Sequence, residues 1–360
     1  MKILHIHPSM QGGGIESMIC GLANEMAKTA DVTVCSIFEP KESDVFWWKL
    51  GSVVKKVSLG KRKQGFSLRE IFKIYTFIRD GGFDVVSLHG FMFYYILSVF
   101  LLHKKVKFFY TVHSDAKMEC SSWDKKFFAI KRFFFRHGWV RPITISATSK
   151  HSFTDLYHCD SQLIFNGVAH PILREEDPVK QYRKTVETTV FVHAGRIDTP
   201  KNQVVLCRVF SRIIREGRDV VLLIAGSKQK QLIFEQMEPF FSDRIIYLGE
   251  RSDIPQLMSC SDAMCLPSIW EGLPVTLLEA LSVGCVPICS SVGGIPDVIS
   301  DGNNGILSAS SSENDYYSAV MRFLDMGDNE RNSLSSAARS SFEKYEIGNT
   351  AQEYLKYYAR

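Results

Sequence analysis

Two glutamates stand eight positions apart in the stretch SIWEGLPVTLLEALSVG, which runs from residue 268 to residue 284. Pro274 lies between them, and a helix accepts proline only in its first turn. We therefore expect Glu271 in a loop and Glu279 inside a helix. A carboxylate accepts hydrogen bonds, so Glu279 can hold the two hydroxyls of a ribose, while Glu271 reaches a group further out.

The segment between the two glutamates favours a phosphate. The amides of Gly272 and Leu273 precede the helix, and a helix start attracts anions. Apolar residues recur with helical spacing and predict one buried face, at Pro274, Leu277, Leu278, Leu281 and Cys285. An unpaired carboxylate beside that face would be costly. The order carboxylate, amides, carboxylate is thus the outline of a sugar nucleotide: sugar, diphosphate and ribose.

A second motif, AGRIDTPKN, places two cations five positions apart, Arg196 and Lys201, between a predicted strand and a predicted helix. Arginine contacts oxygens with two parallel hydrogen bonds and lysine acts as a mobile point charge. Two such cations suit a diphosphate. The alternative is a solvated loop, because isolated cations are common on surfaces.

The first half of the chain carries two weaker motifs. PSMQGGGIES contains three consecutive glycines, of which Gly13 and Gly14 open a predicted helix and allow backbone to approach an anion closely. It is not the GxGxxG pattern, so a dinucleotide is not specifically indicated. TVHSD ends a predicted strand and directs His113 toward a ligand, although a lone histidine is also compatible with a structural role.

Strands alternating with helices position these motifs. The sequence predicts a strand at KILHIH, VTVCSIF, DVVSLHG, KFFYTVH and PITIS, and again at VFVHAG, VVLLIAG, RIIYLG, AMCLP and VPICS. This alternation is typical of an α/β protein with doubly wound parallel sheets. We predict two Rossmann-like domains, residues 1–170 and 171–346, facing a cleft and joined by a linker rich in charges and prolines. Each motif falls at the carboxyl end of a strand, where such sheets bind ligands.

Charge is unevenly distributed along the chain. Residues 1–170 hold 23 Lys+Arg against 14 Asp+Glu, which gives +9, and the remainder holds 20 against 25, which gives −5. A basic half suits an anionic partner. Its densest patch, KKFFAIKRFFFRHGW (residues 125–139), fits either an anionic membrane surface or a helix with a phenylalanine core face and a solvated basic face.

Other sequence features limit the classes of protein to which the chain can belong. The apolar run at residues 91–102 is too short to span a bilayer and predicts a buried helix. The start of the chain lacks the features of a signal peptide, which favours a cytoplasmic protein, either free or peripheral at the inner membrane face. The nine cysteines form no CxxC pair, so we expect reduced thiols and no metal site. Nothing indicates a nucleic-acid partner.

The motifs resemble those of the GT4 family of glycosyltransferases, which have the GT-B fold. EGLPVTLLEA matches the E-x7-E motif of that family, GRIDTPKN matches its G-R-x4-K motif, and GGGIES, TVHSD, FNGV, LGERSDI and SVGGIPDVI follow in family order. The resemblance covers nearly the whole chain. It implies transfer of a sugar from a nucleoside diphosphate sugar, a UDP- or GDP-sugar in the first instance, with retention of configuration and without a cofactor or metal.

The resemblance also implies residue roles. Glu271 contacts hydroxyls of the donor sugar and Glu279 the ribose, while Arg196 and Lys201 stabilise the leaving diphosphate. The glycine-rich loop (Gly13, Gly14) and the amides of Gly272 and Leu273 approach the phosphates, and His113 lies beside the sugar. Residues 347–360 look like the last helix of the family, which crosses back onto the first domain.

Two other classes remain open at this point. A sugar-nucleotide epimerase shares the two-domain fold and would need further acid–base carboxylates, for which Glu16 and Asp115 are candidates. A non-catalytic subunit could bind sugar nucleotides for a partner enzyme. Motif variants such as GGIE and EGLP look like those of bacterial polysaccharide or lipopolysaccharide assembly enzymes, which implies a glycan or lipid-linked glycan acceptor. Donor sugar, base, acceptor and linkage stay undetermined.

Overall fold

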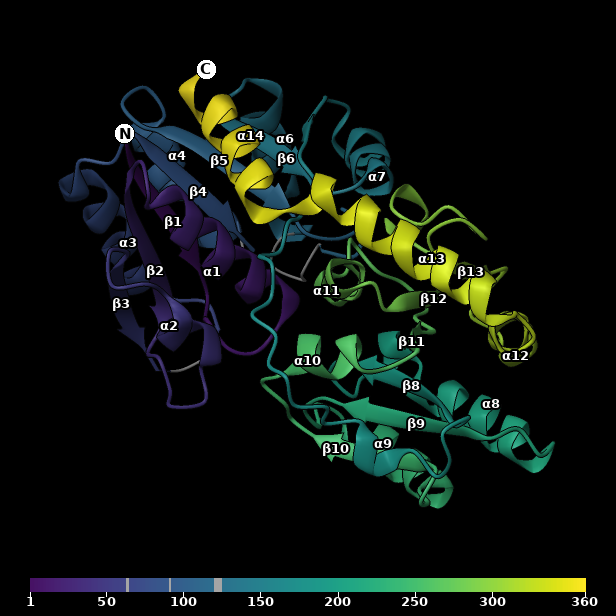
Figure 1. Cartoon of the computed structure of the whole chain (residues 1–360). Coiled ribbons are helices and arrows are strands. Elements are labelled where there is room, and N and C mark those ends of the chain that lie inside the picture. The colour runs from purple at the N-terminus through teal and green to yellow at the C-terminus, as the bar shows by residue number, and fades with distance from the viewer. Residues whose placement is uncertain (63–64, 91, 120–124) are drawn as a thin grey trace. The chain divides into compact units, whose positions relative to one another are not determined.

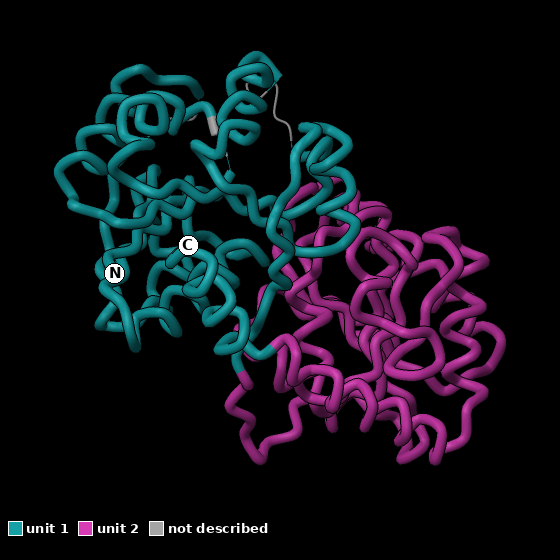
Figure 2. The backbone as a smooth tube through the Cα atoms, turned by 90° about the horizontal axis from the view of Figure 1, so that it is seen from above, with its two compact units in different colours: residues 1–169, 346–360 teal, residues 170–345 magenta. Residues whose placement is uncertain are grey.

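The computed structural model describes residues 1–62, 65–90, 92–119 and 125–360 (Figure 1). The chain divides into two compact units (Figure 2). Unit 1 comprises Met1–Ala169 together with Glu346–Arg360, and unit 2 comprises His170–Tyr345. The C-terminal segment therefore packs with the first half of the chain, although it follows the second half in sequence.

The sheet of unit 1 is parallel throughout. Its described strands follow the order β3-β2-β1-β4-β5-β6-β7, and they are β1 (Lys2–His7), β2 (Asp31–Phe38), β3 (Lys55–Lys61), β4 (Val85–His89), β5 (Lys107–Val112), β6 (Val140–Thr144) and β7 (Gln162–Leu163). The order reverses between β1 and β4, so their carboxyl ends form the point where such sheets bind ligands. The five predicted strands are confirmed, and β3 and β7 were not predicted.

Helices cover both faces of this sheet. They are α1 (Gly14–Met26), α2 (Val45–Lys49), α3 (Leu68–Gly81), α4 (Ile96–Leu102), α6 (Phe128–Arg136), α7 (Ala147–Tyr157) and α14 (Ile347–Ala359). Alternate strand residues such as Leu4 and Ile6 join the core that includes side chains of α3, α4, α6 and α7. α14 packs against α1, and its Tyr354 hydroxyl lies 3.4 Å from the Thr111 hydroxyl of β5.

Unit 2 repeats the arrangement with the order β10-β9-β8-β11-β12-β13, again all parallel. The described strands are β8 (Thr189–Ala194), β9 (Val220–Ala225), β10 (Ile245–Gly249), β11 (Ala263–Leu266), β12 (Val286–Ser290) and β13 (Ile306–Ser308). The helices are α8 (Gln203–Arg215), α9 (Gln231–Met237), α10 (Ile254–Ser259), α11 (Val275–Val283), α12 (Glu313–Leu324) and α13 (Asp328–Ser341). The strand order reverses between β8 and β11. Only β13 was not predicted.

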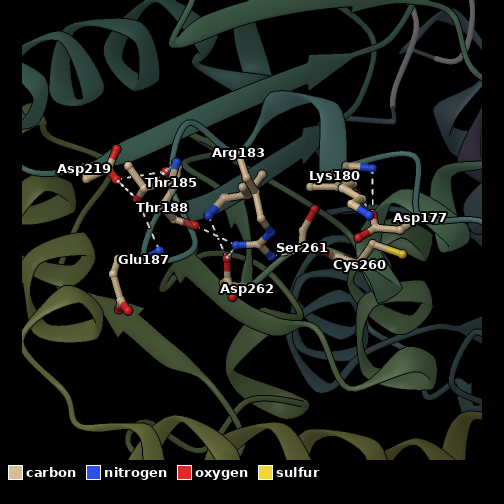
Figure 3. Close-up of polar contacts among 12 residues, drawn as sticks. Asp177, Lys180, Arg183, Thr185, Glu187, Thr188, Asp219, Cys260, Ser261 and Asp262 are labelled. Carbon is tan, nitrogen blue, oxygen red and sulfur yellow. Dashed lines mark hydrogen bonds and ion pairs between the residues drawn. The ribbon is translucent and has the colours of Figure 1, made fainter.

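The end of the predicted linker (residues 167–184) and the residues that follow it are fastened to unit 2 (Figure 3). Arg183 donates from its guanidinium to the Thr188 carbonyl at 2.6 Å and to the Asp262 carboxylate at 3.1 Å. Thr185 and Thr188 both donate through their hydroxyls to Asp219, at 2.7 and 2.8 Å. These contacts fix the chain before β8, at the amino ends of the strands and thus at the edge opposite the predicted motifs.

The apolar run at residues 91–102 is only partly buried. Phe91 lies outside the described residues. In α4, Val99 and Leu102 are buried, as expected, but Phe100 and Leu101 are 59% and 49% exposed. Among the described residues, none of the helices combines the length and the apolarity that crossing a bilayer requires.

The cysteines in the described part of the chain are free thiols, and Cys120 lies outside it. Burial raises the pKa of Cys265 to about 12, and it also raises the pKa of Cys285 and Cys289 well above the ordinary value. These thiols are therefore protonated and unreactive near neutral pH.

Candidate functional site

In unit 2, the turn after β8 is tied to the turn after β11. The side-chain amide of Asn202 donates to the carbonyl of Pro267 at 3.1 Å, and the backbone N–H of Ile269 donates to the carbonyl of Pro200 at 2.8 Å. Asn202 has φ 57°, a left-handed conformation that asparagine tolerates. These bonds hold the GRIDTPKN and EGLP motifs side by side at the switch point of the sheet.

The consequence is an ion pair between the two motifs. The Lys201 Nζ atom lies 2.6 Å from Oε1 of Glu271, and the two side chains are only 20% and 10% exposed. The Ser268 hydroxyl donates to the same carboxylate oxygen at 2.6 Å. A carboxylate so little exposed needs such partners, because burying an unpaired charge is costly. Sequence reasoning placed both residues at this site but did not predict that they contact each other.

A glycine turn supports the loop that carries Glu271. Gly293 has φ +57°, and a Cβ atom built on it would lie 1.9 Å from the carbonyl oxygen of Glu271. The N–H of Gly294 donates to the carbonyl of Gly272 at 2.7 Å. Any larger residue at position 293 would displace the Glu271 loop, which gives the SVGGIPDVI motif a physical reason.

Helix α11 begins directly after this loop. Pro274 is its N-cap, so Glu271 precedes the helix and Glu279 lies inside it, as predicted. Leu277, Leu278 and Leu281 are fully buried, whereas Glu279 is partly exposed. Glu279 is five residues beyond Pro274, about 7.5 Å along the axis. The loop and helix therefore present a carboxylate, a helix start and a second carboxylate in that order.

The second predicted cation, Arg196, is exposed at the end of β8. Within the described part of the chain its guanidinium makes no ion pair. Its backbone is fixed, because the side-chain amide of Gln203 donates to the Arg196 carbonyl at 2.8 Å. The turn after β8 also packs closely against Gly226, because a Cβ atom built on Gly226 would lie 1.9 Å from the carbonyl oxygen of Gly195.

In unit 1, the glycine-rich loop leads into α1 as predicted. Gly13 is the N-cap and Gly14 the first helical residue, and no side chain caps this helix start. A Cβ atom on Gly12 would meet nothing within 4 Å. At Gly13, however, a Cβ atom would lie 2.5 Å from Oε2 of Glu16, so this carboxylate already lies against the start of α1. The contact of Gly13 and Gly14 with a phosphate stays a prediction.

His113 directly follows β5 and is only 8% exposed. Its Nε2 atom lies 2.9 Å from Nδ1 of His89, and its backbone N–H donates to a carboxylate oxygen of Glu119. Burial, helped by the charge of His7, lowers the pKa of His113 to about 3. The ring is therefore neutral at physiological pH.

Sequence reasoning missed the neighbours of His113. His89 and His5 are fully buried, and His89 Nε2 lies 3.2 Å from His5 Nδ1. The signal was present in the sequence, because strand alternation places His5, His89 and His113 on the same face of three neighbouring strands.

No cluster of three or more histidine, cysteine, aspartate or glutamate side chains among the described positions has a geometry that could hold a metal ion. Metal-independent chemistry remains a prediction from the cations and amides described above.

Two family models match consecutive parts of the chain. The Glycosyltransferase Family 4 model matches residues 12–170, and the model of glycosyl transferases group 1 matches residues 175–341. The first match covers most of unit 1 and begins at Gly12, within PSMQGGGIES, and the second covers most of unit 2, while residues 347–360 lie outside both matches.

Similar proteins of known activity include three bacterial enzymes. The N-acetyl-alpha-D-glucosaminyl L-malate synthase of Bacillus anthracis is 24% identical over 55% of this chain and 53% of its own length. The UDP-Gal:alpha-D-GlcNAc-diphosphoundecaprenol alpha-1,3-galactosyltransferase of Escherichia coli is 30% identical over 38% of this chain and 36% of its own length. The aligned part of the chain thus spans about half of the length of the first relative and less than half of the length of the second.

A third relative aligns over almost its full length. It is the GalNAc-alpha-(1->4)-GalNAc-alpha-(1->3)-diNAcBac-PP-undecaprenol alpha-1,4-N-acetyl-D-galactosaminyltransferase of Campylobacter jejuni, which is 22% identical over 99% of this chain and 98% of its own length.

Solved structures establish the fold. Anabaena HepE, crystallised with UDP and glucose, has a TM-score of 0.82 at 16% identity and covers 100% of this chain and 99% of its own. WaaG, a glycosyltransferase involved in lipopolysaccharide biosynthesis, has a TM-score of 0.74 at 14% identity and covers 99% of each chain. With two parallel α/β units and both family matches, the chain belongs to the GT-B glycosyltransferases that join a family 4 domain to a group 1 domain.

Proposed function

We propose that this protein transfers a sugar from a nucleoside diphosphate sugar to a lipid-linked glycan during assembly of a bacterial surface polysaccharide, with retention of configuration and without a metal. The observation that carries the proposal is the arrangement in unit 2: Lys201 paired with Glu271 directly before the start of α11, and Glu279 within that helix. This arrangement offers separate contacts for a sugar, a diphosphate and a ribose.

In this proposal the diphosphate leaves with the help of cations and amides. Lys201 is already held near the helix start, and Arg196 is exposed and without an ion-pair partner among the described residues. The backbone of Gly272 and Leu273 adds the partial positive charge of a helix start. The roles of His113, Gly13 and Gly14 toward the same donor stay predictions from the family resemblance.

Retention is proposed from the family resemblance, and the state of Glu271 bears only on whether this residue acts as a nucleophile. Its Oε1 atom accepts from both Lys201 and Ser268 at 2.6 Å. A carboxylate held in this way is suited to orienting sugar hydroxyls, and its nucleophilicity is reduced by both bonds. We therefore propose same-face transfer without a glycosyl-enzyme intermediate on this glutamate.

A lipid-linked acceptor is supported by the activities of the Escherichia coli and Campylobacter relatives, both of which are named for action on diphosphoundecaprenol-linked sugars. The epimerase alternative receives less support. Its candidate base Asp115 accepts hydrogen bonds from the backbone N–H groups of Lys117 and Met118 at 2.8 and 3.3 Å, which assigns this carboxylate a role in a turn.

The test of the function is a donor panel. We expect one class among UDP-, GDP- and ADP-sugars to raise the melting temperature, and the same donor to yield a glycosylated undecaprenyl diphosphate product whose anomeric configuration, measured by NMR, equals that of the donor. Epimerised free sugar nucleotide, or an inverted product, would contradict the proposal.

Peripheral membrane association also remains a proposal, and the structure corrects one part of its basis. Lys131 was predicted to belong to the basic face of residues 125–139, but it is 3% exposed, with its Nζ atom 4.6 Å from the centroid of the Tyr110 ring. A lysine stem packs readily in apolar surroundings. Lys131 is therefore part of the core around α6.

The remaining residues of this stretch divide between core and surface. Phe134 and Phe135 are buried, whereas Ile130 and Phe133 are each 40% exposed. The exposed cations of the stretch are Lys125, Lys126 and Arg136. Exposed cations beside exposed apolar side chains are typical of surfaces that bind anionic lipid.

We expect the chain to bind vesicles containing anionic lipid, and salt to weaken this binding. Each cation contributes about 1 kcal/mol near such a surface, so changing Lys125, Lys126 and Arg136 together to serine should weaken binding about a hundredfold. The matched control changes Lys180, Arg208 and Arg215 of unit 2 to serine, and should bind as the unaltered chain does. Vesicle flotation measures both. Equal vesicle binding by the two triple variants would contradict membrane association through residues 125–139. This stretch would then simply be a helix with a solvated basic face.

A further inference from the structure

Three buried histidines form a continuous row on the sheet of unit 1. His5 lies on β1, His89 ends β4 and His113 follows β5, and these three strands are neighbours in the sheet (Figure 1). In the parallel register, His5 is opposite Ser87 and His89 is opposite Thr111. Residues two apart on a strand share a face, so all three rings lie on one side of the sheet.

Two hydrogen bonds join the rings. His5 Nδ1 lies 3.2 Å from His89 Nε2, and His89 Nδ1 lies 2.9 Å from His113 Nε2. His5 and His89 are fully buried, and His113 is 8% exposed. Both nitrogens of His89 are thus engaged by another histidine.

The rings are neutral at physiological pH. Burial lowers the pKa of His5 to about 4 and that of His113 to about 3, and it lowers the pKa of His89 well below the ordinary value. The other titratable groups near the row are His7, whose ring centroid is 6.4 Å from that of His89 and whose pKa is also lowered by burial, and Glu16, whose charge acts on His7. Glu119 accepts from the backbone N–H of His113.

Neutral rings constrain the protons. A neutral imidazole carries one N–H, so one of its nitrogens donates and the other accepts. If His89 donates to His5, it must accept from His113. If it donates to His113, it must accept from His5. The two hydrogen bonds therefore run in one direction along the row.

The surroundings of His5, at one end of the row, decide the direction in which the two hydrogen bonds run. His5 Nε2 is buried and has no hydrogen-bond partner among the described residues. A row that ran toward His5 would place its proton on Nε2 and leave a buried N–H unsatisfied, which is rare in proteins. A row that runs from His5 leaves only an unused lone pair there. Ser87, whose hydroxyl lies 3.3 Å from His89 Nε2, is compatible with this direction as a second donor.

We propose that this row is a tautomer relay: His5 donates to His89, His89 donates to His113, and His113 consequently carries its proton on Nδ1. Within the described residues His113 Nδ1 makes no hydrogen bond, so it is available to donate to an oxygen of a ligand. His5 and His89 are positioning residues that make His113 a donor. The identity of that oxygen, a hydroxyl or phosphate oxygen of the donor substrate, rests on the proposed function, whereas the relay itself does not.

The first test needs no ligand. Ring nitrogen chemical shifts of the ¹⁵N-histidine-labelled full chain at pH 7.5 distinguish the two neutral tautomers. We expect Nδ1–H signals for His5, His89 and His113, each assigned by its own substitution. A proton on Nε2 of His113 would overturn the relay.

Variants of His89 test the coupling. His89→Leu removes the donor, and we expect His113 to lose its fixed Nδ1–H tautomer. His89→Asn keeps an N–H near the position of Nδ1 and should restore that tautomer. If the leucine variant does not fold, His5→Leu combined with Ser87→Ala replaces it, because His89 then loses both donors that fix its own proton. An unchanged His113 spectrum in a folded leucine variant would refute the proposal.

Kinetics connect the relay to transfer. With UDP-glucose and UDP-N-acetylgalactosamine as probes, losing one donated hydrogen bond should lower kcat/KM about tenfold in His89→Leu, with rescue in His89→Asn. The control is His103→Leu, a histidine stacked on Trp139 outside the row, which should keep full activity. Equal activity of His89→Leu and the unaltered chain would overturn the use of His113 as a donor. Absence of transfer by the unaltered chain with every UDP-, GDP- and ADP-sugar of the donor panel, with the Nδ1–H signals present, would refute the proposed function and leave the relay intact.

Discussion

Transfer should continue at close to its full rate in excess EDTA, and Arg196→Ala and Lys201→Ala should each lower turnover about a hundredfold or more. Cleavage of the sugar–phosphate bond leaves negative charge on the diphosphate. The sequence has no Asp-x-Asp motif to bind a metal at that charge, and these cations lie at the switch point of unit 2. A preorganised donor of this kind contributes roughly 3–4 kcal/mol to transition-state stabilisation. Steady-state rates with and without EDTA measure the effect.

Arg196→Ala and Lys201→Ala should differ in their effects on the stability of the protein. Arg196 is exposed and has no ion-pair partner in the described part of the chain, so its removal leaves the turn intact. Removing Lys201 leaves Glu271, which is 10% exposed, without its cation, so some stability should be lost as well. The double variant should lose less than the sum, because both cations act on one charge.

The control for this pair is Lys230→Ala. Lys230 is an exposed lysine that forms an ion pair with Asp198 at 3.0 Å in the same turn region, yet it has no proposed contact with the diphosphate. It should keep nearly full turnover. Strict dependence on Mg²⁺ or Mn²⁺, together with near-normal rates in both single variants, would contradict the cation mechanism.

The sequence predicts the interior of both sheets well and their edges poorly. Strands such as β8 and β9 are buried along their whole length, so an unbroken apolar run indicates them. β3 lies at the edge of its sheet, and its sequence KKVSLGK begins with two solvent-exposed lysines, Lys55 and Lys56. Edge strands carry such charges because these discourage pairing with other chains, and this composition hides the strand from a search for apolar runs.

The candidate site likewise has features that local sequence rules predict and features that they do not. Pro274 places Glu271 before a helix and Glu279 within it through local rules, and the structure has this arrangement. The pairing of Lys201 with Glu271 joins residues 70 positions apart and depends on bonds between two turns, which no local rule supplies. Likewise, the burial of Lys131 depends on Tyr110 and Tyr157, which come from other elements of unit 1.

Glu279→Ala and Glu271→Ala should separate in their effects on nucleotide binding and on turnover. The ribose is present in both substrate and product, so loss of its carboxylate weakens every nucleotide complex. Hydrogen bonds to a charged group contribute about 1.5–3 kcal/mol each, so Glu279→Ala should raise the Kd of the free nucleoside diphosphate roughly tenfold to a hundredfold. Calorimetry with UDP and GDP measures this directly.

Glu271 should behave in the opposite way, because the proposal places it against the sugar, which the free nucleoside diphosphate lacks. Glu271→Ala should leave the Kd of that nucleotide nearly unchanged and lower turnover by about tenfold or more. Glu271→Gln tests the ion pair separately, since the amide can still accept from Ser268 but removes the charge that faces Lys201. Glu235→Ala, an exposed glutamate on α9, is the matched control and should change neither quantity. If both Glu271→Ala and Glu279→Ala weakened nucleotide binding equally, the two carboxylates would not divide sugar from ribose, and the assignment of the E-x7-E motif made above would be wrong.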